Sequence, residues 1–275
     1  DITNLVDVLE AVRGINYVFH CAGKVSFLPN DADYMHSVNV NGTANIVNAC
    51  LTHQVSGICH VSSISALGRS SSGLYDEFSE WSESEYNSRY AISKYAAEME
   101  VWRGIEEGLQ AVIVNPGIII GPGDWVNDSS AIFSKVDSGL RFFTDGINGF
   151  VSVEDVTNAM IQLMENRIHG ERFVLVGDNI PFKEVMEIIS EELGVAKADI
   201  AAGPWLSAFA WRVDKIRSKI SGTRPLITKE TARSAQSKSV YSNKKIMGVL
   251  SGSMSDPRPS IRRTAQVYKK AKSGS

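Results

Sequence analysis

The stretch Tyr17-Val18-Phe19-His20-Cys21-Ala22-Gly23 is a short apolar run that stops at three small residues. Two later runs have the same form: Ile58–Val61, followed by two serines, and Ala111–Val114, followed by Asn-Pro-Gly. Short apolar runs that end in turn-forming residues are typical of strands buried in a parallel sheet. The three runs therefore predict parallel strands, and polar or small residues follow the carboxyl end of each strand.

Helical periodicity separates these runs. Apolar residues recur at helical spacing over Val38–Leu51, and a long helix signal covers Tyr90–Glu107. Phe173–Val176 predicts another buried strand, and Phe182–Leu193 predicts an amphipathic helix that ends at Gly194. Strands that alternate with helices predict right-handed βαβ units, and hence an α/β fold with a doubly wound parallel sheet.

The composition excludes several classes of protein. The 275 residues carry a net charge of −3, with 43% hydrophobic and 21% charged residues, which excludes a disordered chain. No apolar run reaches the roughly 18 residues of a membrane-spanning helix. Three cysteines, an odd number, indicate free thiols in a reducing compartment.

The charge is unevenly distributed along the chain. Residues 212–275 hold 16 Lys and Arg against 3 Asp and Glu. These cations are interleaved with apolar residues, which favours a solvated helical lobe over a nucleic-acid or membrane surface.

Three residues can form one proton-transfer site. Tyr90 and Lys94 stand four positions apart in the predicted long helix, so both side chains face the same side. A free tyrosine has a pKa of about 10, and a cation within about 5 Å favours its phenolate form. Ser63 follows the second strand, at the edge where parallel sheets bind ligands, and its hydroxyl can hydrogen-bond a reacting oxygen. Taken alone, the Tyr-Lys spacing also fits an exposed helix pair.

Seven segments, in this order and spacing, resemble the extended short-chain dehydrogenase/reductase family. That family includes sugar-nucleotide epimerases, dihydroflavonol reductases and 3β-hydroxysteroid dehydrogenases, and the resemblance covers nearly all of residues 1–180. The segments are Asp1-Ile2, His20-Cys21-Ala22-Gly23, Asn39-Val40-Asn41-Gly42-Thr43, Val61-Ser62-Ser63, Tyr90-x-x-x-Lys94, Asn115-Pro116-Gly117 and Phe150-Val151-Ser152-Val153-Glu154-Asp155-Val156. The segment Leu140–Gly146 is closer to the reductase and hydroxysteroid branch.

The resemblance implies an oxidoreductase that uses NAD or NADP on a ketone or secondary alcohol. Tyr90 would be the general acid/base, Lys94 would lower the pKa of that phenol and bind the nicotinamide ribose, and Ser63 would hold the substrate oxygen. The implied cofactor contacts are Asp1, Ile2, Cys21, Ala22, Gly23, Val61, Tyr90, Lys94, Pro116, Gly117, Ile118 and Ile119. Residues 1–123 and 150–178 would form a Rossmann-like dinucleotide-binding domain, and residues 124–149 and 179–275 a smaller, mostly helical substrate-binding lobe.

One part of the family pattern is not found in this sequence. No strand followed by a Gly-rich turn and a helix occurs, although the family carries this fingerprint before its Asp1-Ile2 segment. We therefore expect the Rossmann-like domain to be N-terminally incomplete, and the natural protein to extend about fifty to sixty residues before Asp1. The residue that selects NAD or NADP would lie in that segment.

Two other functions stay open. A sugar-nucleotide epimerase or dehydratase would regenerate its cofactor in each cycle, whereas a dinucleotide-binding regulator would catalyse no reaction. The complete set of Ser63, Tyr90 and Lys94 argues against the regulator. We also expect a small-molecule substrate, a cytoplasmic homodimer, no spanning membrane segment and no nucleic-acid partner.

Three other groups of residues suggest chemistry less strongly. His20-Cys21, Cys50-x-x-His53 and Cys59-His60 look like parts of a zinc site, but neighbours on a strand face opposite sides, so we expect no metal. The acidic stretch Asp76–Glu85 predicts a solvated loop rather than a carboxylate pair. The apolar side chains at Trp205, Leu206, Phe209 and Trp211 fit a pocket wall, a membrane-surface stripe or the core of the lobe.

Overall fold

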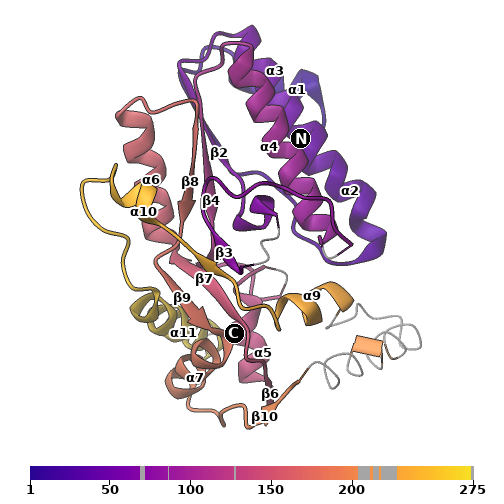
Figure 1. The fold of residues 1–275 in the computed structure, drawn as a ribbon, viewed down its shortest axis with the longest axis vertical. Helices are drawn as coiled ribbons and strands as arrows, with labels where there is room; N and C mark the ends of the chain where they lie inside the picture. The colour runs from indigo at the N-terminus through magenta and orange to yellow at the C-terminus, as the bar shows by residue number, and fades with distance from the viewer. Residues whose placement is uncertain are drawn as a thin grey trace. The chain divides into compact units, whose positions relative to one another are not determined.

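The computed structural model of the chain describes residues 1–68, 72–85, 87–126, 128–203, 211–212, 217 and 228–273. These residues form two compact units (Figure 1). The first unit comprises Asp1–Gly117, Val156–Leu175 and Ser242–Ser253, and the second comprises Ile118–Asp155, Val176–Tyr241 and Met254–Ser275. The predicted aromatic group at Trp205, Leu206 and Phe209 lies outside the described residues.

The first unit is built on a parallel sheet with the strand order β1-β2-β4-β8. The strands are β1 (Tyr17–His20), β2 (Gly57–Val61), β4 (Ala111–Pro116) and β8 (Glu171–Leu175). The predicted α/β fold with a parallel sheet is confirmed, and the strands agree with the apolar runs to within about two residues at each end. β2 and β4 are almost entirely buried, which explains why their sequences are continuous apolar runs rather than alternating ones.

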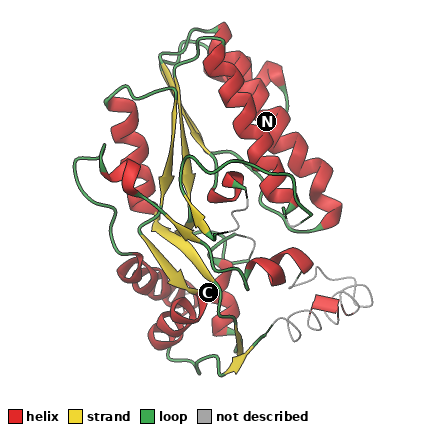
Figure 2. Cartoon of the chain, viewed as in Figure 1, coloured by secondary structure: helices red, strands yellow, loops and turns green. Residues whose placement is uncertain are grey.

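Helices cover both faces of this sheet (Figures 1 and 2). One face carries α1 (Leu5–Val12), α3 (Gly42–Thr52) and α4 (Arg89–Glu106), which share a core with β2 and β4. α6 (Val153–Glu165), which begins in the second unit, lies on the opposite face, where Met164 packs against Gly57 of β2. β1 forms an edge of the sheet, and its Tyr17 and Phe19 side chains are exposed.

The remaining elements of the first unit are short. They are a 3₁₀ turn at Pro29–Asp31, α2 (Ala32–His36), a π-helical turn at Ser37–Asn41, a 3₁₀ turn at Ile64–Leu67, β3 (Leu74–Tyr75) and α10 (Lys244–Met247). α2, the π-helical turn and α3 follow one another without a break, so the helix predicted from Val38 begins six residues earlier, at Ala32. π-helical turns are rare and are frequently found at functional sites.

The second unit combines a small mixed sheet with helices. β5 (Ile118–Ile120) pairs in parallel with β7 (Ile147–Ser152), which pairs in antiparallel with β9 (Asp178–Pro181). α5 (Ala131–Asp137), α7 (Phe182–Leu193) and α11 (Pro257–Ser273) pack on one core with this sheet. α7 ends at Gly194 with a left-handed φ of 75°, as the glycine predicted. Shorter elements are β6 (Phe142–Phe143), β10 (Ile200–Ala201), α9 (Lys229–Ser234) and β11 (Val240–Tyr241).

Four basic residues of α11 form ion pairs within the second unit. Arg258 contacts both Asp178 and Glu184, and Lys272 contacts Asp137 at 2.7 Å. Arg262 and Arg263 are also paired, with Glu192 and Glu154. This use of its charge agrees with the prediction of a solvated helical segment. Within the described part of the chain, no helix is long and apolar enough to cross a membrane.

Candidate active site

Ser63 is the second residue after β2, and its side chain is held by a hydrogen bond from the turn that follows. Its extended φ and ψ place it as the N-cap of the 3₁₀ turn Ile64–Leu67, where Oγ accepts a hydrogen bond from the Ser65 amide at 3.1 Å. Serine is a favoured N-cap residue because its side-chain oxygen satisfies an amide of the first turn. The local sequence therefore fixes the Ser63 hydroxyl at the carboxyl end of the parallel sheet, where such folds bind ligands.

Helix α4 brings Tyr90 and Lys94 to the same place. Ser88 caps α4 by accepting a hydrogen bond from the Ala91 amide at 3.0 Å, so Tyr90 sits in the first turn and Lys94 one turn later. The Ser63 side chain lies near the Tyr90 phenol and acts to lower the pKa of that phenol. The ring of Phe27 packs edge-on against Tyr90, with 5.8 Å between the centroids. The structure therefore brings the predicted proton-transfer group together.

The protonation of Tyr90 differs from the expectation. Burial raises the pKa of the phenol above its ordinary value of 10.0, and the Ser63 side chain counteracts part of this rise. The resemblance implies that Lys94 lowers this pKa, but Lys94 is not among the groups that shift it. Instead, the Lys94 ammonium donates its hydrogen bond to the carbonyl oxygen of Val61 at 2.8 Å, so its charge is directed at the strand end. Tyr90 is therefore a protonated acid at neutral pH in this arrangement.

Lys94 is itself a perturbed group. Its side chain is buried, and desolvation lowers the pKa of the ammonium to about 8, although Glu98 and Cys21 act in the opposite direction. A methyl group added at Gly23 would lie 3.9 Å from Lys94 Nζ, which places the end of β1 beside the ammonium. Strongly shifted lysines concentrate at functional sites.

Asn39 was not assigned a role from the sequence, and the structure places it beside this group. It belongs to the π-helical turn, and its Oδ1 accepts a hydrogen bond from the Lys24 amide at 2.7 Å. Its Nδ2 donates to the Lys24 carbonyl and to Ser93 Oγ, both at 2.9 Å. Asn39 thereby ties the segment after β1 to α4. The sequence singled out Asn39 only as part of the family segment Asn39–Thr43, without a role for its side chain.

The remaining predicted cofactor contacts lie at several places. Cys21, Ala22 and Gly23 follow β1 and are exposed, and Val61 ends β2. Pro116 ends β4, and the Gly117 amide donates to the Leu175 carbonyl at 2.9 Å.

The last four predicted contacts stand apart from the proton-transfer group. Ile2 packs on Gly42 of α3, and the Asp1 carboxylate accepts hydrogen bonds from the amide and hydroxyl of Thr3. Ile118 and Ile119 belong to β5 of the second unit. The described contacts therefore join Val61 and Gly23 to the proton-transfer group, and do not join these four residues to it.

Two observations bear on whether a dinucleotide fits. The oxygen Oδ1 of Asn115 is fully buried without a hydrogen-bond partner, although Nδ2 of the same side chain donates to Ser63 O at 3.0 Å. Exposed small residues also follow β1, beside the Lys94 ammonium. An unsatisfied acceptor and small residues at adjoining strand ends fit a polar ligand bound at this edge of the sheet.

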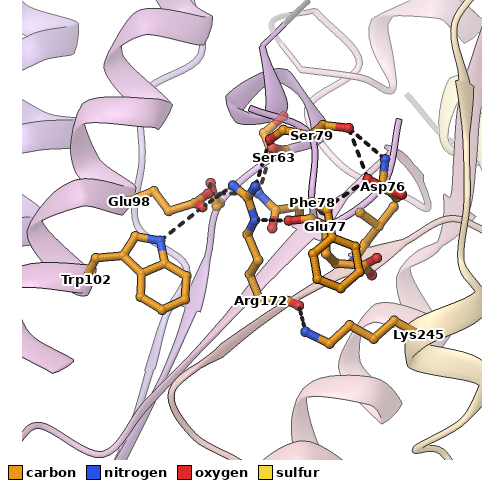
Figure 3. A network of polar contacts seen from close by, with 12 residues as sticks. Ser63, Asp76, Glu77, Phe78, Ser79, Glu98, Trp102, Arg172 and Lys245 are labelled. Carbon is orange, nitrogen blue, oxygen red and sulfur yellow. Dashed lines mark hydrogen bonds and ion pairs between the residues drawn. The ribbon is translucent and has the colours of Figure 1, made fainter. Parts of the chain in front are cut away.

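A second cluster of polar residues surrounds Arg172 of β8, and the sequence did not predict it. The Arg172 guanidinium of β8 lies between the Glu98 carboxylate and the segment Glu77–Ser79 (Figure 3). Glu77 is buried, and its Oε1 accepts a hydrogen bond from the Val174 amide at 2.8 Å. The expectation of a solvated acidic loop is therefore wrong for Glu77, because an amide of β8 compensates the burial of its carboxylate.

The cysteines and histidines do not form a metal site in the described part of the chain. All three cysteines are free thiols there, and Cys50 and Cys59 are buried. No group of three metal-binding side chains comes together among the described residues. His20 and His60 are buried neighbours on β1 and β2, and desolvation lowers the pKa of both rings.

Comparison with known proteins assigns the chain to a family. The model of the NAD dependent epimerase/dehydratase family matches residues 1–176, and the chain belongs to that family. The resemblance to the extended short-chain dehydrogenase/reductases is thereby confirmed.

Several curated proteins are similar to the chain. Sterol demethylase protein B from Methylococcus capsulatus is 27% identical over 208 residues, covering 75% of this chain and 63% of that protein. Cinnamoyl-CoA reductase 1 from Petunia hybrida is 29% identical over 203 residues, covering 70% of this chain and 60% of that protein. A putative dihydroflavonol 4-reductase from Synechocystis is 24% identical over 246 residues, covering 86% and 71%. The chain thus spans less than two thirds of the length of the first two relatives.

Solved structures share the fold. The crystal structure of gox2253 has a TM-score of 0.81 and 26% identity, and covers 98% of this chain and 83% of that one. The dTDP-glucose 4,6-dehydratase DesIV from Streptomyces venezuelae, solved with NAD bound, has a TM-score of 0.77 at 18% identity, covering 99% and 79%. At that identity the second likeness concerns the fold alone.

Proposed function

We propose that this protein is an NAD- or NADP-dependent oxidoreductase that reduces a ketone to a secondary alcohol. The observation that carries the proposal is the grouping of the Tyr90 phenol near the Ser63 side chain, with the buried Lys94 ammonium one helical turn away. A proton donor and a second hydrogen-bonding hydroxyl then face one point, where a substrate oxygen would be held.

In the proposed reaction, these side chains handle the substrate oxygen. The Ser63 hydroxyl orients the carbonyl oxygen, and Tyr90 donates its phenolic proton as negative charge develops there. The raised pKa of Tyr90 suits this direction, because the phenol stays protonated at neutral pH. The buried Lys94 ammonium, one helical turn away, would hold the nicotinamide ribose beside this group. A bound nicotinamide would supply the hydride.

The residues proposed to hold the cofactor lie mainly on the first unit. Lys94 would donate to the nicotinamide ribose, and Cys21, Ala22 and Gly23 would border the ribose and phosphates at the end of β1. Asp1 and Ile2 would flank the adenine, and Val61 and the segment Pro116–Ile119 the nicotinamide. The buried, unpaired Asn115 Oδ1 supports a polar ligand at this edge. The domain assignment made from the sequence, with a substrate-binding lobe at 124–149 and 179–275, belongs to the same proposal.

The curated relatives favour a reductase over an epimerase. The relatives named above include a cinnamoyl-CoA reductase and a putative dihydroflavonol 4-reductase. A 2-alkyl-3-oxoalkanoate reductase from Stenotrophomonas maltophilia is 26% identical over 212 residues. An epimerase or dehydratase stays the second candidate, since the family model covers these activities by its description.

We extend the proposal to the setting of the enzyme. It would act in the cytoplasm as a homodimer on a small-molecule substrate, without a nucleic-acid partner. The ion pairs of α11 support the last point, because Arg258 and Arg262 are already bound to carboxylates. Exposed apolar side chains on α4, at Ile92 and Met99, support association of two copies.

Two measurements on the purified protein test the function. Binding of NAD, NADH, NADP and NADPH is followed by calorimetry, and a panel of ketones is then screened for loss of the reduced-nicotinamide absorbance. A reductase consumes the free reduced cofactor in proportion to the alcohol formed, whereas an epimerase leaves its amount unchanged. Binding of none of the four dinucleotides by the natural protein would contradict the proposal.

A further inference from the structure

The carboxylate of Glu98 is buried next to the proposed site, in contact with Ser62, the neighbour of Ser63. Glu98 has no exposed surface, and it lies one helical turn after Lys94 on α4. Its Oε2 accepts hydrogen bonds from Ser62 Oγ at 2.7 Å and Asn115 Nδ2 at 2.9 Å. Its Oε1 accepts from Arg172 Nη1 at 3.1 Å (Figure 3). Burial of a carboxylate is costly, and here it is compensated by donors from three strands or their ends.

These contacts converge on three consecutive residues at the end of β2. The Val61 carbonyl accepts from Lys94 Nζ, and the Ser62 hydroxyl donates to Glu98. The Ser63 carbonyl accepts from Asn115 Nδ2, and the same Nδ2 also donates to Glu98 Oε2. One face of α4 therefore fixes residues 61–63, through Lys94 and Glu98 directly and through Asn115 at one remove. The backbone that carries the Ser63 hydroxyl is therefore attached to α4, in addition to the local N-cap contact.

Arg172 in turn fixes the carboxylate from the other side. Its Nε donates to the Glu77 carbonyl at 2.8 Å, and its Nη2 donates to the Ser79 carbonyl at 2.9 Å. The guanidinium therefore reaches Glu98 in a fixed direction, because two backbone carbonyls accept hydrogen bonds from its Nε and Nη2. Arg172 contacts only Oε1 of Glu98, so Oε2 can accept hydrogen bonds from Ser62 and Asn115.

The charge of Glu98 also acts on Lys94. Desolvation lowers the pKa of Lys94, and Glu98 is the largest influence that raises it. The other titratable groups acting on or affected by Lys94 are Cys21 after β1, His20 of β1 and His60 of β2. Both imidazoles have lowered pKa values and are neutral near pH 8, so Glu98 is the main group that keeps Lys94 charged.

We propose that Glu98 is the positioning residue of this site: its carboxylate joins residues 61–63 to α4 and gives Lys94 a negative neighbour one turn away. The proposal rests on the proposed function, in which Ser63 and Lys94 act on the substrate. Glu98 itself touches no reacting atom and acts through Ser62, Asn115 and Lys94.

The test of the charge uses Glu98→Gln, which keeps the size of the side chain and removes its charge. The protein is labelled with [ε-¹³C]lysine, and the Lys94 signal, identified by its loss in Lys94→Arg, is titrated without cofactor or substrate. We expect the midpoint to fall from about 8 by about one pH unit. Glu77→Gln is the matched control, because Glu77 is a buried carboxylate whose backbone carbonyl still binds Arg172. The control leaves the Lys94 midpoint unchanged.

The test of positioning uses Glu98→Asp, which keeps the charge opposite Arg172, and so the fold, but shortens the side chain by one carbon. The amides of Ser65 and Ala66 donate to the Ser63 hydroxyl and carbonyl, so their hydrogen exchange reports on Ser63. We expect exchange at both amides to become about tenfold faster, while the Lys94 midpoint stays near its original value.

Each part can fail by itself. An unchanged Lys94 midpoint in Glu98→Gln, or unchanged exchange of Ser65 and Ala66 in Glu98→Asp, would overturn the assignment. Both measurements are made on the protein alone, so they give an answer whether or not the protein reduces a ketone. A failure of the proposed function is seen separately, in the cofactor-binding and turnover assays.

Discussion

Lys94 donates a hydrogen bond of 2.8 Å from Nζ to the carbonyl oxygen of Val61, at the carboxyl end of β2. Only 6% of Lys94 is exposed, and this burial lowers the pKa of its ammonium from 10.5 to about 8. At neutral pH the native state therefore keeps a charge in a place that disfavours it. The burial that makes Lys94 chemically useful also lowers the stability of the fold.

Replacement of Lys94 should stabilise the protein. We expect Lys94→Met to raise the free energy of unfolding at pH 7 by about 1–3 kcal/mol. Each unit by which burial lowers the pKa corresponds to about 1.4 kcal/mol of lost stability, which the substitution restores. The loss of the hydrogen bond to Val61 offsets part of this gain. Urea denaturation measures the change. Lys183→Met, at a lysine that is half exposed on α7, should change stability by less than about 0.5 kcal/mol.

The pH dependence of that gain has a definite sign. Below pH 8 Lys94 is charged in both the native and the unfolded state, so the native protein bears the full free-energy cost of burying the ammonium. Between about 8 and 10.5 the native state releases the proton before the unfolded state does, so the stability of the natural protein rises with pH. The advantage of Lys94→Met should therefore shrink over this interval. An advantage that grows from pH 8 to 10 would contradict the lowered pKa of Lys94.

Ketone reduction should fall as pH rises through about 8. Lys94 loses its proton there, whereas the raised pKa of Tyr90 keeps the phenol protonated beyond pH 10. The fall of kcat/KM on the alkaline side of the profile then reflects the deprotonation of Lys94. Lys94→Arg should move that fall to higher pH, since a guanidinium stays charged. If the fall kept its position in that variant, another group would be responsible.

Removal of the Tyr90 hydroxyl should abolish most of the turnover without unfolding the protein. We expect Tyr90→Phe to lower kcat by about 10²–10⁴, the usual contribution of a positioned acid or base. Tyr95→Phe is the matched control on the same helix, because Tyr95 stacks on Trp81 at 4.3 Å between centroids and has no contact with Ser63 among the described interactions. Turnover in Tyr90→Phe equal to that of the control would exclude Tyr90 as the acid.

Gly104 should be required for the packing of α4 on α3. A methyl group at Gly104 would lie 2.6 Å from Val47 Cγ1 and 3.1 Å from Leu109 Cδ2, both in the core of the first unit. Although alanine is the better helix former, we expect Gly104→Ala to destabilise the fold by about 1–3 kcal/mol through overpacking. Gly203→Ala, where no atom lies within 4 Å, should be nearly neutral in thermal denaturation.

The parallel strands and the long helix could be predicted from local patterns. β2 and β4 are buried along nearly their whole length, so each shows as a continuous apolar run bounded by turn residues. The i, i+4 spacing of Tyr90 and Lys94 places both on one face of any helix. α1 was missed because its eight residues gave only a short periodic signal, and β5 and β9 because strands of three and four residues are hard to distinguish from loops. β7 is longer, but Asn148 and Gly149 interrupt its apolar run.

The sequence by itself determined the α/β class and the family, and it indicated Ser63, Tyr90 and Lys94 as candidates, because these depend on patterns within elements and on the order of segments along the chain. Only the tertiary structure decided the burial of Glu98 and Glu77 and the direction of the Lys94 hydrogen bond. Glu98 meets Ser62, Asn115 and Arg172 across 36, 17 and 74 positions of the chain. Whether a charged side chain is solvated or buried depends on partners at such distances. Desolvation, which sets the pKa values of Tyr90 and Lys94, arises only when those partners pack together.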